Sequence, residues 1–260
     1  MNTPSTEVGR ALVRRPGPLL AEGIVTHIDR VPVDVGLAFQ QWDRYVEAVD
    51  AAGWTIVEVP PADDCPDAVF VEDTVVMYHD LAVITRPGAD TRKPEIVAVE
   101  DVLTKLGCAI NRISAPGTLD GGDVLKIGTD VYVGRGGRTN AEGVRQLRRM
   151  LEPFGANVIG VPLDRVLHLK SAVTALPDGS VIGYPSLVDE PEVFASFRAV
   201  PEESGAHVVL LGGDRLLLSA SCPKSAELFA ELGYEPVLVD ISEYEKLEGC
   251  VTCLSVRLRP

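Results

Sequence analysis

One pattern recurs along this chain and restricts the folds that it can adopt. Two short apolar runs flank a turn, a segment with apolar residues at helical spacing follows, and a third apolar run ends the unit. In the clearest copy, residues 124–127 and 131–133 are the first two runs, Thr139 or Asn140 can cap the helix, and residues 157–161 are the third run. Each unit therefore predicts a hairpin, a helix and a strand.

Four further copies are spaced along the chain. Their hairpins are expected at residues 69–85, 171–184 and 208–219, and one hairpin is divided between the chain ends, with residues 254–258 pairing with 11–14. Their helices are expected at residues 95–106, 225–232 and 37–52, with only a weak helix near 192–197. Closing strands are expected at residues 109–113, 235–239 and 55–59.

The hairpins argue against a parallel doubly wound sheet, in which neighbouring strands need crossover connections. The sequence also lacks the glycine-rich motifs of dinucleotide and phosphate-loop sites. We therefore predict an α/β fold, a five-bladed pseudo-symmetric α/β propeller with ββαβ-type modules around a central active site. We expect one catalytic domain over residues 1–260, with the N- and C-terminal segments completing one module. An ordinary α/β domain with mixed connections is the alternative.

Composition and charge narrow the class of partner. Hydrophobic residues are 46% and charged residues 24% of the chain, which are ordinary values for a folded globular protein. With 24 Lys and Arg against 38 Asp and Glu, the formal net charge is −14. This charge repels phosphate backbones and argues against nucleic acid or an anionic membrane as a partner. It is compatible with a cationic small-molecule substrate.

Other features bear on location. The apolar stretches are far shorter than a membrane span, and residues 1–10 are polar and lack the apolar core of a secretory signal. Five cysteines are an odd number in a chain of this size, so a disulfide framework is not expected. These features predict a cytoplasmic protein, and both a monomer and a homodimer are compatible with them.

In a ring of such modules the strand ends converge near one axis, so functional groups should occur once per module at similar places. Polar clusters meet this expectation at residues 67–73, 120–123, 168–171 and 252–253. Within them Cys253, His168 and Asp120 suit a nucleophile, a base and an acid. Each has an ordinary alternative, namely a buried thiol, a structural imidazole and an Asp-Gly-Gly turn.

Two close pairs allow further interpretations. Cys250 and Cys253 form a Cys-x-x-Cys pattern, which is typical of redox or zinc sites. A second such pair is absent from the sequence, and the residues that follow read as a strand rather than a helix. Glu72 and Asp73 interrupt an apolar run. They either face water on an edge strand or form a site for a guanidinium group, whose planar N–H donors match carboxylates.

Seven motifs that occur in order carry a family resemblance. They are Arg15-Pro16, Val69-Phe70-Val71-Glu72-Asp73-Thr74, Ile84-Thr85-Arg86-Pro87-Gly88-Ala89, Asp120-Gly121-Gly122-Asp123-Val124, Arg138-Thr139-Asn140, Leu167-His168-Leu169-Lys170 and Thr252-Cys253-Leu254-Ser255. The set resembles the dimethylarginine dimethylaminohydrolase family of the pentein, or amidinotransferase-like, superfamily, over nearly the whole chain. It implies the five-bladed fold and a small guanidino amino acid as substrate. The implied reaction converts asymmetric dimethylarginine or monomethylarginine to citrulline and an alkylamine, through a covalent S-alkylthiouronium intermediate and without a metal or organic cofactor.

The resemblance also implies roles for individual residues. Cys253 is the nucleophile, His168 the general acid and base, and Asp120 the third catalytic residue, where some family members have Glu. The implied substrate-binding residues are Asp73 at the guanidinium with Glu72 in support, Asp67 at the amine, Arg92 and Arg138 at the α-carboxylate, and Ile24 on a mobile lid. Cys250 has no counterpart in the pattern.

Related functions stay open at this level. An arginine deiminase, an agmatine deiminase and an amidinotransferase share the chemistry, although agmatine has no α-carboxylate for Arg92 and Arg138. The alternative of a different class is a non-enzymatic propeller that acts as a binding protein, against which Cys253, His168 and Asp120 argue. Because a turn can bring two cysteines three residues apart together, we also expect a mild oxidant to link Cys250 to Cys253 reversibly.

Overall fold

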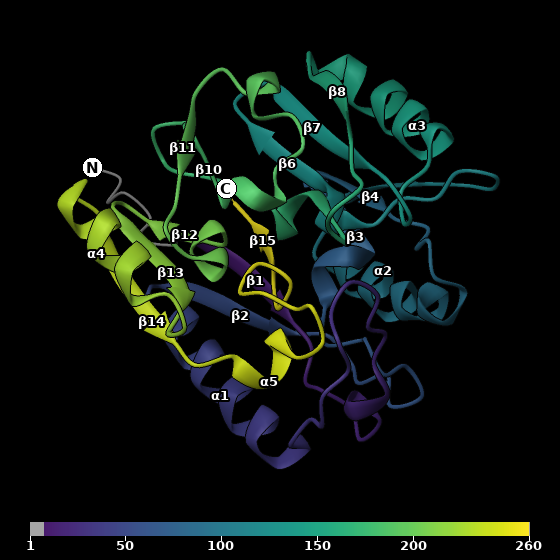
Figure 1. The fold of residues 1–260 in the computed structure, drawn as a ribbon. Helices are drawn as coiled ribbons and strands as arrows, with labels where there is room; N and C mark the ends of the chain where they lie inside the picture. The colour runs from purple at the N-terminus through teal and green to yellow at the C-terminus, as the bar shows by residue number, and fades with distance from the viewer. Residues whose placement is uncertain (1–7, 260) are drawn as a thin grey trace, which may run out of the picture.

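Antiparallel hairpins completed by a parallel third strand recur through residues 8–259, the part of the chain that the computed structural model describes (Figure 1). In these residues the strands form five three-stranded sheets, each with a middle strand antiparallel to an inner strand and parallel to an outer one. The predicted pseudo-fivefold α/β propeller is therefore confirmed. Residues 1–7, which belong to the polar segment considered for a signal, and residue 260 lie outside the described residues.

Listed from the inner to the outer strand, the sheets have the following bounds. They are β15 (Val256–Leu258), β1 (Gly9–Val13) and β2 (Trp54–Glu58); β3 (Val75–Tyr78), β4 (Leu81–Ile84) and β5 (Ala109–Arg112); β6 (Val124–Ile127), β7 (Asp130–Arg135) and β8 (Asn157–Pro162); β9 (Val173–Ala175), β10 (Val181–Gly183) and β11 (Phe197–Ala199); and β12 (Val209–Gly212), β13 (Arg215–Ser219) and β14 (Glu235–Val239).

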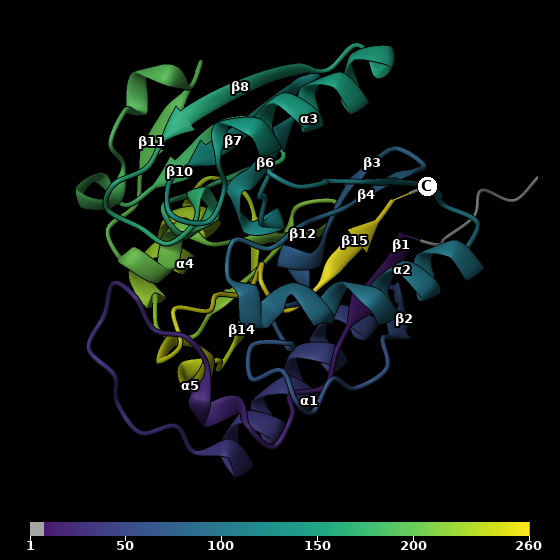
Figure 2. The same cartoon turned by 90° about the vertical axis from the view of Figure 1, so that its right-hand side faces the viewer.

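Four of the modules connect their middle and outer strands through a helix. The helices are α1 (Val35–Ala51), α2 (Ile96–Lys105), α3 (Ala141–Leu151) and α4 (Pro223–Glu231), and a short α5 (Ser242–Glu245) precedes the last inner strand. Figures 1 and 2 show α1 to α4 around the outside of the sheets. As expected, Asn140 caps α3, accepting a hydrogen bond from the Gly143 N–H at 2.8 Å. Among the described helices, none is both long and apolar enough to traverse a lipid bilayer.

The expected weak helix near residues 192–197 is wrong. This segment contains a 3₁₀ turn at Pro191–Val193, and Phe197 starts the outer strand β11. Pro185 and Pro191 each begin a 3₁₀ turn, because proline fixes φ and supplies no amide donor to continue an α-helix. The fourth module in chain order therefore closes its sheet without a helix.

The two ends of the chain meet in one module, as the sequence predicts. Strand β1 lies between β15, with which it pairs antiparallel, and β2, with which it pairs parallel. The register places Ala11 opposite Arg257 on one side and opposite Ile56 on the other. This pairing joins the first and last segments of the described chain in the same sheet.

The first strand of the second module starts later than expected, because residues Val71–Thr74 form a 3₁₀ turn before β3. The same kind of turn precedes β6 at Gly121–Asp123 and β9 at Leu169–Ser171. The turns are closed by hydrogen bonds from Asp73 N to Phe70 O, Asp123 N to Asp120 O and Ser171 N to His168 O, at 3.0–3.2 Å. The polar clusters of three modules thus sit in one repeated local structure at the entrance to the inner strand.

The inner strands surround one axis. Residues from β3, β6, β9, β12 and β15 all line the same central cavity. The apolar core lies mainly between neighbouring modules; in one cluster Val83 of β4 and Val124 of β6 pack with Leu147 of α3. The axis therefore has two ends, and the repeated 3₁₀ turns lie at one end of it.

Candidate active site

A small cavity of about 20 Å³ collects most of the predicted site residues. Its lining includes seven of them, which are Ile24, Asp67, Asp73, Arg92, Arg138, His168 and Cys253. The cavity has room for about one water molecule. A substrate of amino-acid size therefore requires the lining segments to move apart.

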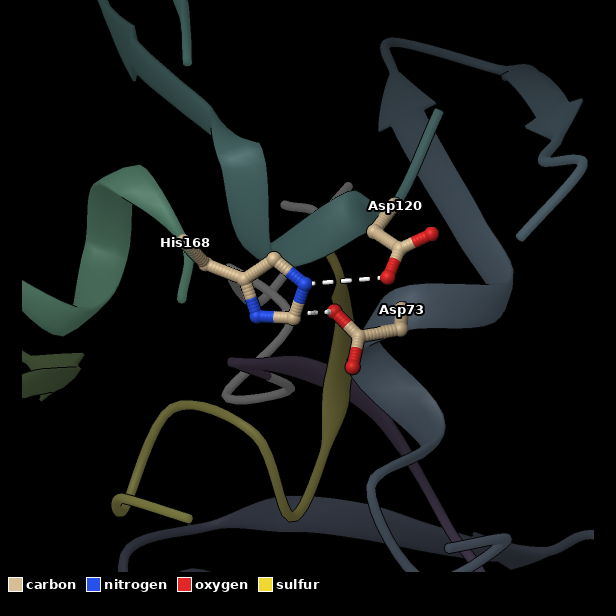
Figure 3. Close-up of side chains that lie close together, drawn as sticks. All are labelled: Asp73, Asp120 and His168. Atoms are coloured by element: carbon tan, nitrogen blue, oxygen red, sulfur yellow. Dashed lines mark hydrogen bonds and ion pairs between the residues drawn. The ribbon is translucent and has the colours of Figure 1, made fainter. Parts of the chain in front are cut away.

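The imidazole of His168 faces two buried carboxylates, which lie on the same side of the ring (Figure 3). Its Nε2 is 2.9 Å from Asp120 Oδ2, and its Nδ1 is 3.8 Å from Asp73 Oδ1. Burial opposes the charged imidazole, but Asp73 and Asp120 outweigh it and raise the pKa of His168 to about 9. At neutral pH His168 is therefore an imidazolium that can donate a proton.

Asp73 stays ionised. Its burial favours the protonated form, yet His168 and the Arg92 guanidinium, 2.5 Å away, lower the pKa of this carboxyl below its usual range. The Gly122 N–H also donates to Asp73 Oδ1 at 2.8 Å. A side chain at position 122 would place its Cβ 2.6 Å from that oxygen, so only glycine allows this approach.

Asp73, Asp120 and His168 also form a group that could hold a metal ion, since their ligand atoms lie within 4.8 Å of one another. The charges already present argue for another use. The Arg92 guanidinium occupies one oxygen of Asp73, and a protonated His168 has no lone pair to give to a metal. This donor set is better matched to proton transfer and to a cationic ligand than to a divalent cation.

The position of Asp120 leads to a prediction about pH dependence. Because His168 has a raised pKa, its protonated form is present below pH about 9 and is lost as the pH rises through that value. Asp120→Asn removes the carboxylate that accepts from His168, so we expect the alkaline limb of kcat/KM to move to lower pH by roughly one unit or more. A pH profile of kcat/KM measures this shift, with exposed Asp178→Asn as control. An unchanged alkaline limb would show that Asp120 does not set the protonation of His168.

Cys253 is buried beside Cys250, with 3.3 Å between the two sulfur atoms. The hydrogen bond with Cys250, burial and the nearby carboxylates Glu72 and Asp73 raise the pKa of the Cys253 thiol. All five cysteines lie within the described residues and all are free. Cys253 is therefore a thiol in the resting site, and a cation bound next to it would favour the thiolate.

The contact between the two sulfurs gives the expected oxidation a geometric basis. Hydrogen peroxide oxidises one thiol to a sulfenic acid and is itself reduced to water, and the second thiol then attacks the sulfenic sulfur and displaces a second water to form the disulfide. We expect wild type to lose two hydrogen atoms by mass together with its activity, and to recover both with a reductant. Cys250→Ser should instead accumulate sulfenic acid or mixed disulfides at Cys253. Identical oxidation products and recovery in the two proteins would refute the disulfide.

The two predicted carboxylate-binding arginines differ in their surroundings. Arg92 is fully engaged, with Nη1 on Asp73 and with Nε and Nη2 on Glu95 at 3.0 and 2.9 Å. Arg138 has one ion pair, a 3.8 Å contact with Asp120, and its side chain remains 11% exposed. Of the two, Arg138 has the guanidinium that is available to an incoming carboxylate.

Ile24 and Asp67 are tied together at the edge of the cavity. The Ile24 N–H donates to Asp67 Oδ1 at 3.0 Å, and burial raises the pKa of Asp67 although Arg92 opposes this.

The sequence did not predict Glu248, which also lines the cavity and accepts hydrogen bonds from the N–H groups of Thr26 and His27 at 2.5 and 2.9 Å. Nothing in the sequence around Glu248 distinguishes it from a surface carboxylate.

Glu72 does not line the cavity that contains Cys253. Its carboxylate points to the other side of the turn, where Oε1 is 2.5 Å from Lys170 Nζ and 3.7 Å from Arg257 Nη2. Its backbone N–H donates to Cys253 O at 3.2 Å, so Glu72 is connected to Cys253 through the main chain. Asp123 was also not predicted as a site residue. Its Oδ1 accepts a hydrogen bond from Leu169 N at 3.0 Å and so holds the turn next to His168. The Asp120-Gly121-Gly122-Asp123 motif was the sequence feature that could have identified it.

Comparison with known proteins places this geometry among guanidino-group enzymes. The arginine deiminase family model matches residues 60–212, more than half of the chain. The chain is 67% identical to an N(G),N(G)-dimethylarginine dimethylaminohydrolase of Streptomyces coelicolor, over 96% of this chain and 97% of the relative.

Two solved structures of dimethylarginine dimethylaminohydrolase superpose on it with TM-scores of 0.90. One is the Pseudomonas aeruginosa enzyme, a cysteine-to-serine variant complexed with citrulline, at 34% identity, covering 97% of this chain and 100% of the other. The second is a histidine-to-glycine variant as an adduct with S-methyl-L-thiocitrulline, at 33% identity, covering 96% and 100%.

Proposed function

The chain belongs to the dimethylarginine dimethylaminohydrolase family, and we propose that it hydrolyses asymmetric dimethylarginine and monomethylarginine to citrulline and an alkylamine. One observation carries the proposal: Cys253, His168 and the ionised Asp73 line one cavity, and Asp120 holds His168. A nucleophile, a proton donor and an anionic site for a cation therefore converge on one point.

Binding and attack follow from the charges. The guanidinium of the substrate is delocalised and a poor electrophile, and Asp73 stabilises it next to Cys253. The bound cation lowers the raised pKa of Cys253, so the thiol releases its proton to solvent and the thiolate sulfur forms a bond to the guanidinium carbon. The substrate therefore brings the charge that activates the thiol.

His168 serves both halves of the reaction. As an imidazolium it donates its proton to the amine nitrogen of the tetrahedral species; the C–N bond breaks, the alkylamine leaves, and a thiouronium stays on Cys253. The neutral imidazole then takes a proton from water, whose oxygen bonds to the carbon. Cleavage of the C–S bond releases citrulline and returns the Cys253 sulfur.

A panel of substrates tests the proposal. The protein is incubated separately with arginine, monomethylarginine, asymmetric dimethylarginine and agmatine, and citrulline or carbamoylputrescine is quantified. We expect kcat/KM to be highest for the methylated arginines. A preference for free arginine would assign an arginine deiminase activity instead, which the family match keeps as the second candidate because one methyl group changes binding by only about 1–3 kcal/mol. Absence of turnover on all four would favour a binding protein.

The two arginines lead to a separate prediction. We expect Arg138→Ala to raise KM for carboxylate-bearing substrates by roughly 10- to 150-fold, the equivalent of a lost charged hydrogen bond, and to leave agmatine-like compounds nearly unaffected. Arg92→Ala should in addition lower stability by about 3–5 kcal/mol, since it leaves Asp73 and Glu95 buried without their cation. Steady-state kinetics and thermal unfolding measure both effects. Equal KM effects on substrates with and without the carboxylate would contradict the role of Arg138.

The proposal extends to surroundings and partners. A catalytic thiol and four further free cysteines are suited to the reducing cytoplasm. The net charge of −14 supports a small cationic substrate rather than nucleic acid or a membrane, and it is compatible with a monomer or a homodimer.

A further inference from the structure

A second and larger cavity lies on the propeller axis, on the other side of the catalytic turns. Its volume is about 440 Å³, and all five inner strands contribute to its wall. Glu72, Lys170 and Thr252 line it, whereas the nearby Asp73, His168 and Cys253 line the catalytic cavity. Neighbouring residues of the same turns thus form a thin wall between the two cavities. The exposed residue His79 lines the larger cavity, so it communicates with solvent.

Positive charge is concentrated in this axial cavity. Lys126 of β6, Lys170, Arg257 of β15 and Arg259 line it, and Glu72 is the single carboxylate among its lining residues within the described chain. Desolvation of its amine and the three neighbouring cations lower the pKa of Lys126 to about 7, although the residue as a whole is exposed. Lys126 is therefore partly protonated at neutral pH, and a bound anion would favour its charged form. Burial and Arg257 lower the pKa of Arg259 as well. A chain with a net charge of −14 thus gathers three cations and a partly protonated Lys126 around one carboxylate in this cavity.

The polar contacts within the cavity compensate only part of this charge. Glu72 Oε1 is bound to Lys170, and the Lys126 ammonium donates to the Met77 carbonyl at 2.5 Å. Arg257 donates to Ser255 Oγ at 2.8 Å, and Arg259 makes a 3.4 Å contact with the Leu210 carbonyl. These carbonyl and hydroxyl acceptors are neutral. The one carboxylate near the cations, Glu72 Oε1, is 3.7 Å from Arg257 Nη2 and is already bound to Lys170. Lys126 and Arg259 have no ion pair with a carboxylate among the described residues.

Glu72 itself supplies a second and independent observation. Its side chain is only 7% exposed, yet Oε2 is buried with no hydrogen-bond partner among the described residues. A buried carboxylate oxygen without a donor is costly. A bound molecule that carries a hydroxyl would satisfy it.

We propose that the axial cavity binds a small dianionic phosphate compound, with Lys126, Arg257 and Arg259 compensating the phosphate charge and Glu72 Oε2 accepting a hydrogen bond from a hydroxyl group. The volume lies within the range of about 300–1,000 Å³ for small-molecule sites and exceeds what inorganic phosphate alone fills. A phosphate ester with a hydroxyl group and monohydrogen phosphate share the required chemistry. The site is distinct from the catalytic cavity and takes no part in the proposed reaction.

Titration calorimetry at constant ionic strength tests the proposal, with inorganic phosphate and glycerol 3-phosphate as separate probes. We expect saturable binding of at least one probe to wild type. Lys126→Met and Arg259→Met should each weaken it by about tenfold or more, because each removes a charge-assisted contact. Lys224→Met, on the exposed face of α4, removes the same charge outside the cavity and should bind like wild type. Tighter binding of glycerol 3-phosphate identifies a phosphorylated metabolite, and tighter binding of inorganic phosphate identifies the free anion.

Sulfate tests the contribution of Glu72, since it has the charge of monohydrogen phosphate but no proton to donate. It should bind about tenfold more weakly than inorganic phosphate. Equal affinities would overturn the role of Glu72 Oε2. The site as a whole is refuted if wild type shows no saturable binding of either phosphate up to roughly 10 mM. It is also refuted if Lys224→Met weakens binding as much as Lys126→Met and Arg259→Met do, which would reveal non-specific attraction.

Discussion

Replacing Cys253 with serine is expected to lower turnover of methylated arginine by about 10⁴-fold or more, the scale on which a covalent nucleophile contributes. A neutral hydroxyl has a pKa far above that of a thiol, and Asp73 and His168 provide no strong base to deprotonate it in the resting site. Substrate binding should persist, because Asp73 and Arg138 are untouched. Single-turnover kinetics and calorimetry with asymmetric dimethylarginine measure the two quantities.

Cys250→Ser is the matched control for this variant. It makes the same chemical change at the sulfur that lies 3.3 Å from Cys253, and in reducing buffer it should retain turnover within a few-fold of wild type. If Cys253→Ser retained substantial turnover, or if Cys250→Ser lost as much as Cys253→Ser, the nucleophile would be misassigned.

Replacing His168 with asparagine is expected to have the second largest effect, because the imidazole acts in both halves of the proposed reaction. Without it, the amine departs unprotonated and water attacks without a base, so kcat should fall by about 10²- to 10⁴-fold. S-Methyl-L-thiocitrulline separates the two halves, since a thiol leaves without strong acid assistance. With this compound His168→Asn should accumulate a covalent adduct on Cys253, in line with the adduct seen in a histidine-to-glycine variant of a related enzyme.

Intact-protein mass spectrometry detects that adduct, and peptide mapping locates it. The His168→Asn/Cys253→Ser double variant provides the control, because it retains the pocket but lacks the sulfur. Near-normal turnover of asymmetric dimethylarginine by His168→Asn would contradict the assigned role. An adduct at any cysteine other than Cys253 would do the same.

Much of the site was predictable because the fold repeats one local structure. The hairpin of each module has a distinct signal in the sequence, and polar residues placed at the entrance to the inner strands marked where side chains could converge. Asp73, Asp120 and His168 come from three different modules, and they meet because their turns occupy equivalent places on the axis. Gly121 shows how close this approach is, since a Cβ there would lie 2.0 Å from Glu72 O.

Charge pairing was harder to predict, because it depends on contacts between modules. Arg92 was expected at the substrate carboxylate, and the structure places its guanidinium on Asp73 and Glu95. Lys170 was visible within a motif, yet its partner Glu72 is 98 residues away in the chain. Glu248 lies 221 and 222 residues from its two backbone donors. No periodicity connects positions so far apart.

The sequence by itself determined the hairpins of the five modules, the helices of four of them, the closure of one module by the first and last strands, and the kinds of residues that stand at the strand entrances. These follow from apolar spacing, turn residues and helix caps, all of which act over a few neighbouring positions. Only the tertiary structure decided that Glu72 and Asp73, which are adjacent in the chain, line different cavities, Glu72 the axial cavity and Asp73 the cavity of the candidate active site. In a tight 3₁₀ turn successive side chains diverge, and which side each one faces depends on the modules packed around it, here the Arg92 side for Asp73 and the Lys170 side for Glu72.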